Sequence, residues 1–137
     1  MVTVDHAPSS AAAARRELGA DLAARGLPRE VVDDAALILS ELVGNAVRYG
    51  RPLPGNVLQV AWAVEPDCLV VKVTDGGSSQ VPHYRPAGPS EVRGRGLTIV
   101  NALARTWGVD RYENGFGPAS TVWAELEVSG WRSGALS

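Results

Sequence analysis

Two strand-like segments joined by only three residues constrain the fold of this chain most strongly. In Val57–Val64 apolar side chains alternate with small or polar ones, and Cys68–Thr74 is rich in valine. Both patterns are typical of β-strands. The connection Glu65-Pro-Asp67 is too short for a crossover between parallel strands, so the two strands must form an antiparallel hairpin. This hairpin argues against a doubly wound parallel sheet.

The residues before the hairpin have helical spacing. Ser9 or Ser10 is positioned to cap a first helix, which we expect to end immediately before Gly26. Pro28 fits the first turn of a second helix, which we expect to stop immediately before Gly50. The sequence therefore predicts two consecutive helices ahead of the hairpin.

The residues after the hairpin predict a long irregular segment, one helix and two strands. Residues 75–95 lack apolar periodicity, which indicates a lid, a binding loop or a disordered linker. The third helix is expected over Leu97–Thr106, followed by strands over Gly108–Tyr112 and Ser120–Val128. Helices gathered on one face of hairpin-linked strands predict the α+β class. The expected architecture is a two-layer sandwich with a mixed, mostly antiparallel sheet and three helices on one face.

Length and composition predict a single soluble domain. With 137 residues and 45% hydrophobic content, we expect a short N-terminal segment (1–8), one domain (9–128) and a loose tail (129–137). The net charge of -2 gives no electrostatic reason to expect nucleic acid or an anionic membrane as a direct partner. The N-terminus lacks the pattern of a signal peptide, so we expect a cytoplasmic protein. We interpret Cys68, the single cysteine, as a core residue.

A first polar cluster lies on the second predicted helix. Glu41 and Asn45 are four residues apart, so they lie side by side on one helical face. An Asn carbonyl is an oxygen ligand suited to Mg²⁺, and a neighbouring Glu is placed to act as a general base. Taken alone, the same spacing fits a solvent-exposed helix face, and that reading is favoured for an isolated pair.

Two further clusters follow. Asp75-Gly-Gly77 ends a strand, where a carboxylate is placed to accept a hydrogen bond from an amine such as adenine N6; alone, it also fits a plain turn. Arg93-Gly-Arg-Gly-Leu97 lies at a helix start, where free backbone N–H groups favour phosphate; alone, it also fits a flexible lead-in. A P-loop is excluded because no matching motif occurs and the sole lysine, Lys72, lies within a strand.

Taken in order, the three clusters resemble the boxes of the GHKL ATPase family. E-L-V-G-N-A-V-R-Y-G at 41–50 resembles the N box, D-G-G at 75–77 a shortened G1 box, and G-R-G-L-T-I-V at 94–100 the G2 box. The longer sequence around these boxes is similar to that of the small anti-sigma-factor serine/threonine kinases of the RsbW type. The resemblance covers about Arg15 to Leu126 and implies the Bergerat ATP-binding fold.

The resemblance implies ATP and Mg²⁺ as ligands and assigns roles by position. Glu41 is implied as the catalytic base, and Asn45 as the Mg²⁺ ligand. The implied nucleotide-binding residues, besides Asn45, are Asp75, Gly77, Arg93, Gly94, Arg95, Gly96, Leu97 and Thr121. The implied partners are a sigma factor and an anti-anti-sigma protein of the STAS type, whose serine receives the γ-phosphate. The family also allows a homodimer.

The sequence departs from the family pattern at two positions. Ser79 stands where the G1 box usually has its last glycine, and Ala119 and Ser120 precede Thr121 where many relatives have a basic residue. These departures leave a second hypothesis open, a non-catalytic module that binds a nucleotide or a partner. A detached catalytic domain of a histidine kinase is a third hypothesis, ranked last because no phosphohistidine region is recognised in the sequence.

Overall fold

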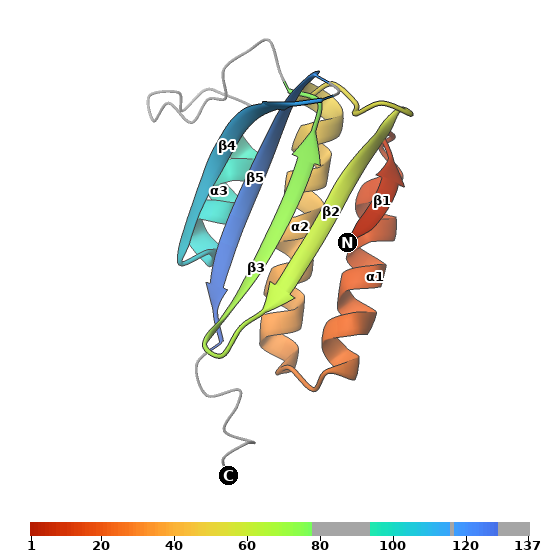
Figure 1. Cartoon of the computed structure of the whole chain (residues 1–137). Helices are drawn as coiled ribbons and strands as arrows, with labels where there is room; N and C mark the ends of the chain where they lie inside the picture. The colour runs from red at the N-terminus through yellow and green to blue at the C-terminus, as the bar shows by residue number, and fades with distance from the viewer. Residues whose placement is uncertain (78–93, 116, 129–137) are drawn as a thin grey trace.

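The protein is described by a computed structural model, which covers residues 1–77, 94–115 and 117–128 (Figure 1). These residues form five strands and three helices. In chain order they are β1 (Val2–Asp5), α1 (Ser10–Ala24), α2 (Arg29–Tyr49), β2 (Val57–Val64), β3 (Cys68–Asp75), α3 (Gly94–Leu103), β4 (Thr106–Asn114) and β5 (Gly117–Glu127).

The five strands form one sheet in the order β1-β2-β3-β5-β4. Every neighbouring pair is antiparallel, and the three helices cover the same face of the sheet (Figure 1). The predicted β2–β3 hairpin is present, with Val64 opposite Leu69 and Gln59 opposite Thr74. The two-layer α+β sandwich is therefore confirmed. No helix of the described residues covers the other face of the sheet, which is called the open face below.

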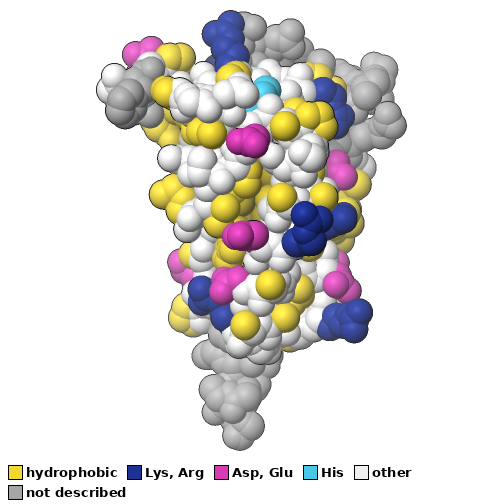
Figure 2. Space-filling model, turned by 90° about the vertical axis from the view of Figure 1, so that its right-hand side faces the viewer, with side chains coloured by type: hydrophobic (Ala, Val, Ile, Leu, Met, Phe, Trp, Pro, Cys, Tyr) yellow, Lys and Arg dark blue, Asp and Glu magenta, His cyan; other side chains and the backbone are white. Residues whose placement is uncertain are grey.

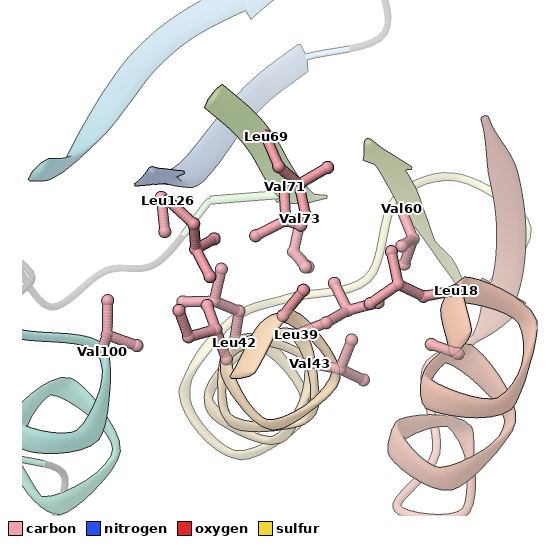
Figure 3. Packing of buried hydrophobic residues seen from close by; sticks show 14 of the residues in the cluster. Leu18, Leu39, Leu42, Val43, Val60, Leu69, Val71, Val73, Val100 and Leu126 are labelled. Atoms are coloured by element: carbon pink, nitrogen blue, oxygen red, sulfur yellow. The ribbon is translucent and has the colours of Figure 1, made fainter. Parts of the chain in front are cut away.

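The hydrophobic core lies between the sheet and α2, the central helix (Figure 3). Figure 3 shows Leu42 of α2 on the side of Val100 in α3, and Val43 on the side of Leu18 in α1. All four side chains are at most 2% exposed, so α2 is anchored on both flanks as well as against the sheet. Burial of this kind stabilises by about 1.5–3 kcal/mol for each large apolar side chain.

The first two helices have the predicted extents, but α1 is not capped as expected. Gly26 adopts a φ of 85° just after α1, and Gly50 follows the last residue of α2. Ser9 makes no side-chain cap hydrogen bond. The hydroxyl of Ser10 instead donates to the carbonyl oxygen of Asp5 at 2.6 Å, which ties the start of α1 to the end of β1.

A short N-terminal strand was missing from the predicted order of elements. β1 pairs with β2, placing Val2 opposite Val60 and Val4 opposite Leu58. Val4 packs against the core, whereas Thr3 is exposed. Four residues give too short an alternation to predict a strand by themselves, and this one forms because β2 offers an unpaired edge.

The third helix lies three residues earlier in the chain than predicted. It runs over Gly94–Leu103, so the predicted end at Thr106 is wrong. Thr106 instead begins β4, opposite Glu125 of β5, and the backbone N–H of Arg105 donates to the carbonyl oxygen of Glu125 at 2.7 Å. Pairing with β5 therefore takes precedence over continued helical periodicity. Most of the irregular segment predicted at 75–95, namely 78–93, and the tail 129–137 lie outside the described residues.

The surface and the buried cysteine agree with the composition. Figure 2 views the edge that carries β1 and α1, where acidic and basic side chains are interspersed and no extended patch of one sign is visible among the described residues. Cys68 is free and buried, as predicted. Within the described part of the chain, none of the helices has the length and apolar character needed to cross a membrane.

Candidate functional site

The C-terminal end of α2 and the C-terminal end of β3 meet at one end of the molecule (Figure 1). Two backbone hydrogen bonds join the segments that follow them: Arg51 N–H to the carbonyl oxygen of Gly77 at 2.9 Å, and Gly76 N–H to that of Arg51 at 2.6 Å. A Cβ on Gly76 would collide with the Pro52 carbonyl group. Gly76 therefore permits this close approach, which joins the end of the helix that carries the first cluster to the second cluster.

Asp75 is a buried carboxylate at the end of β3, only 8% exposed. Its Oδ1 accepts a hydrogen bond from the backbone N–H of Gly77 at 2.7 Å, and Gly77 has a φ of 92° that favours glycine. Burial raises the pKa of Asp75 above its ordinary value, and the Gly77 hydrogen bond and the charges of His6 and Arg111 only partly oppose this. A buried acceptor fixed on a strand end is the arrangement expected of a ligand-reading group.

Two residues that sequence reasoning did not select contact this region. His6, just after β1, places its Nε2 3.0 Å from the carbonyl oxygen of Gly50 and 3.2 Å from that of Ala46. Gly50 lies against the carboxylate of Asp75, because a Cβ added to Gly50 would be 2.7 Å from Asp75 Cγ. The His6 contact has no sequence signal, since β1 itself was not predicted, and the sequence marks Gly50 only as the end of α2 and of the N-box match.

Glu41 and Asn45 lie on the flank of α2 that faces α3. Both are half-buried, and helical geometry places them beside Leu42, whose side chain points toward Val100 of α3 (Figure 3). No hydrogen bond or ion pair joins either side chain to another residue of the described part of the chain. The sequence left a fully solvated helix face open as an alternative, whereas the structure places the pair at the edge of the α2–α3 interface.

Asn45 is suited to Mg²⁺ only in combination with a ligand. The described residues contain no group of three or more His, Cys, Asp or Glu side chains that could hold a metal ion by themselves. Mg²⁺ commonly takes one or two protein oxygens and completes its octahedron with water and phosphate oxygens. The carbonyl oxygen of Asn45, with Glu41 one turn away, fits that sparse requirement.

The third sequence cluster is only partly described. The backbone of Gly94 and Gly96 lies in the first turn of α3, next to α2. Arg93 lies outside the described residues, and so do the side chains of Arg95 and Leu97. The described part of this cluster is therefore the backbone of a ten-residue helix whose first turn is Gly-Arg-Gly-Leu.

Thr121 is not brought together with Asp75. It is opposite Thr74 in the sheet, so both side chains lie on the open face, where their hydroxyl oxygens are 2.7 Å apart. Tyr112 contacts the same hydroxyl of Thr121 at 3.2 Å. The residue opposite Asp75 is Ser120, which is buried and shares the helix-covered face.

Arg111 continues the row formed by Asp75 and Ser120. In the register of β4 and β5 it is opposite Ser120, so the three residues occupy neighbouring positions on the helix-covered face. Arg111 is exposed and forms no ion pair within the described ranges. The positively charged Arg111 is therefore the strand neighbour of Ser120, even though the residue that precedes Thr121 in the sequence is not basic.

The fold and the matching family model together assign this two-layer domain to the histidine kinase-like ATPase class. The chain belongs to the family of histidine kinase-like ATPase domains, whose family model matches residues 4–122. Among solved structures, it is similar to the Acinetobacter baumannii histidine kinase AdeS, with 16% identity and a TM-score of 0.43. That similarity covers 72% of this chain and 48% of the AdeS chain. A search of curated proteins found no match.

Proposed function

We propose that this protein is an ATP-binding anti-sigma factor with serine/threonine protein kinase activity. The observation that carries the proposal is the junction of α2 with β3. It holds the buried carboxylate of Asp75 in fixed relation to the helix that carries Glu41 and Asn45. Family membership supplies ATP as the nucleotide class.

Asp75 would recognise the adenine base. An ionised carboxylate accepts hydrogen bonds and donates none, so it matches the 6-amino group of adenine. Gly77, which has no side chain, would let the base approach the backbone, and Ser120 would offer a second polar group on the same face as Asp75. Arg111 adds positive charge next to Ser120, which favours an anionic ligand at this end of the sheet.

Asn45 and Glu41 would serve the phosphate end of the nucleotide. Asn45 would hold Mg²⁺, which neutralises phosphate charge when bound. Glu41 would take the proton of the attacking serine hydroxyl as its oxygen bonds to the γ-phosphorus. The bond from that phosphorus to the β–γ bridging oxygen breaks, and ADP leaves. The backbone N–H groups in the first turn of α3 would bind phosphate oxygens.

The acceptor and the partners follow from the closer resemblance to the anti-sigma kinases of the RsbW type. The acceptor would be a serine of an anti-anti-sigma protein of the STAS type, and the second partner a sigma factor. The kinase itself would assemble as a homodimer. The wording of the motifs over 41–50, 75–77 and 94–100 supports this proposal.

The proposal is tested first by calorimetric titration of the protein with Mg·ATP, and then by incubation with γ-labelled ATP, Mg²⁺ and a cognate STAS-type protein. We expect ATP to bind and the label to reach a serine of the partner, with transfer lost in Glu41→Ala. Absence of ATP binding would refute the proposal. Binding of ATP and partner without transfer would select the non-catalytic regulatory module.

A further inference from the structure

We propose that His6 and Gly50 are positioning residues that fix the carboxylate of Asp75, and that they thereby set the preference for a 6-amino purine over a 6-oxo purine. This inference rests on the proposed function, because it concerns the base of the nucleotide bound there. It assigns a part in ligand selection to the residue that follows β1 and to the end of α2.

His6 holds the end of α2 through a single ring nitrogen. Among the described residues, two atoms are within hydrogen-bond distance of Nε2, and both are carbonyl oxygens, of Gly50 at 3.0 Å and of Ala46 at 3.2 Å. Carbonyl oxygens only accept hydrogen bonds, so Nε2 must carry the proton. Ala46 and Gly50 are already joined by the hydrogen bond from Gly50 N–H to the Ala46 carbonyl oxygen at 2.9 Å. The imidazole therefore restrains the position of Gly50 relative to the last turn of α2.

Gly50 in turn supports Asp75. Its φ of -99° is ordinary for any residue, so backbone conformation does not require glycine here. The limited space does require glycine, because an added Cβ would be 2.7 Å from Asp75 Cγ and 2.9 Å from the carbonyl oxygen of Ala46. The backbone of Gly50 thus packs directly against one side of the carboxylate, while Gly77 N–H fixes Oδ1 from the other.

A carboxylate that is held on both sides keeps one orientation. This orientation decides which base the carboxylate can pair with. The 6-amino group of adenine donates to a carboxylate, whereas the 6-oxo group of hypoxanthine presents an acceptor and is repelled. A site built to form a hydrogen bond with one substrate group strongly rejects an analogue that lacks this group, because the buried protein group is then left unpaired. If the carboxylate loses its support, it can turn away from the base, and the discrimination weakens.

The test compares the affinities of Mg·ATP and Mg·ITP, which differ at purine position 6. Titration calorimetry is applied to the full chain as wild type, His6→Ala, His6→Gln, Gly50→Ala and the control Gly19→Ala. We expect wild type to prefer ATP by about tenfold or more. We expect His6→Ala and Gly50→Ala to lower that ratio by roughly fivefold. His6→Gln, which retains an N–H donor, should restore part of the ratio.

The ratio separates positioning from a purely structural role. Loss of folded protein lowers the active fraction for both nucleotides equally and leaves the ratio unchanged. Gly19→Ala should keep the wild-type ratio, because beyond its own stretch of helix nothing in the described structure lies within 4 Å of its added Cβ. His6→Ala and Gly50→Ala act from different elements, so either folded variant decides the matter.

The outcomes also separate this inference from the proposed function. A wild type that binds neither nucleotide refutes the proposed function. A wild type that binds ATP and ITP equally refutes the reading of the base by Asp75, and with it this inference, while nucleotide binding stands. An unchanged ratio in folded His6→Ala or Gly50→Ala shows that these residues do not position the carboxylate.

Discussion

Ser120 lies directly opposite Asp75 on the neighbouring strand, and both side chains belong to the helix-covered face of the sheet. Thr121, one residue later, faces the other way and contacts Thr74 and Tyr112 on the open face. Successive residues of a strand alternate between faces, so one step in register decides which hydroxyl stands beside the site.

Substitutions at these two neighbours should therefore have different effects. Ser120→Val adds bulk beside Asp75, and we expect it to weaken ATP binding by about tenfold or more. Thr121→Val removes the hydroxyl shared with Thr74 and should lower the unfolding free energy by about 1 kcal/mol while leaving ATP affinity unchanged. Calorimetric titration and urea unfolding measure the two effects. If Thr121→Val instead weakens ATP binding and Ser120→Val does not, Thr121 contacts the nucleotide, as the family resemblance implies.

Arg111 is expected to contribute to nucleotide affinity through its charge. Arg111→Gln should weaken Mg·ATP binding by roughly three- to tenfold at low salt, with a smaller effect at 0.5 M salt because the contact is solvent-exposed. Arg16→Gln, an exposed arginine on α1, is the matched control and should leave affinity unchanged. Equal losses in the two variants would indicate only a general charge effect.

The charge of Asp75 should cost the unliganded protein stability near neutral pH. Burial raises the pKa of Asp75 above the ordinary value of 3.8, so the folded protein binds this proton more tightly than the unfolded chain does. The stability contributed by the protonated group is present below pH 3.8 and is lost as pH rises through the raised pKa.

Asp75→Asn isolates this effect, because an amide oxygen still accepts from Gly77 N–H but cannot ionise. We expect the variant to unfold at a higher temperature than wild type at pH 7, with the difference shrinking toward pH 4. It should also lose most of its ATP affinity. A difference in Tm that stays constant from pH 4 to pH 7 would show that ionisation of Asp75 carries no stability cost.

Glu41 and Asn45 should separate catalysis from binding. Glu41→Gln keeps the size and polarity of the side chain but removes the base, so phosphoryl transfer should fall by about 10²–10⁴-fold with ATP affinity nearly unchanged. Asn45→Ala should instead weaken ATP binding in the presence of Mg²⁺ and leave the Mg²⁺-free affinity unaffected. Single-turnover transfer and titrations with and without Mg²⁺ check both. Transfer that survives Glu41→Gln would remove Glu41 from the role of base.

Gly108 provides a stability test on the open face, away from the site. It is opposite Trp123, and a Cβ on Gly108 would be 2.6 Å from Cζ2 of that indole. Gly108→Ala should displace the ring, lower the unfolding free energy by about 1–3 kcal/mol and shift the tryptophan emission. Gly115→Ala, in the β4–β5 turn with nothing within 4 Å of its added Cβ, is the control and should cost less.

The sequence by itself determined the elements whose signals are local. Periodicity and the punctuating residues Gly26, Pro28 and Gly50 located α1 and α2, and the three-residue connection after Val64 required an antiparallel hairpin. The three polar clusters were also visible in the sequence, because residue type and spacing are written directly in the chain. The bounds 9–128 of the domain and the roles of the clustered residues remain predictions.

Only the tertiary structure decided the features that depend on pairing between distant segments. β1 exists because β2 offers it an edge, and Thr106 joins β4 instead of α3 because it pairs with Glu125. The contacts of His6 with Gly50, of Gly50 with Asp75 and of Ser120 with Asp75 all link separate elements. Hydrophobic periodicity fixes which face of an element is buried, but packing and strand register fix which residues of two elements meet.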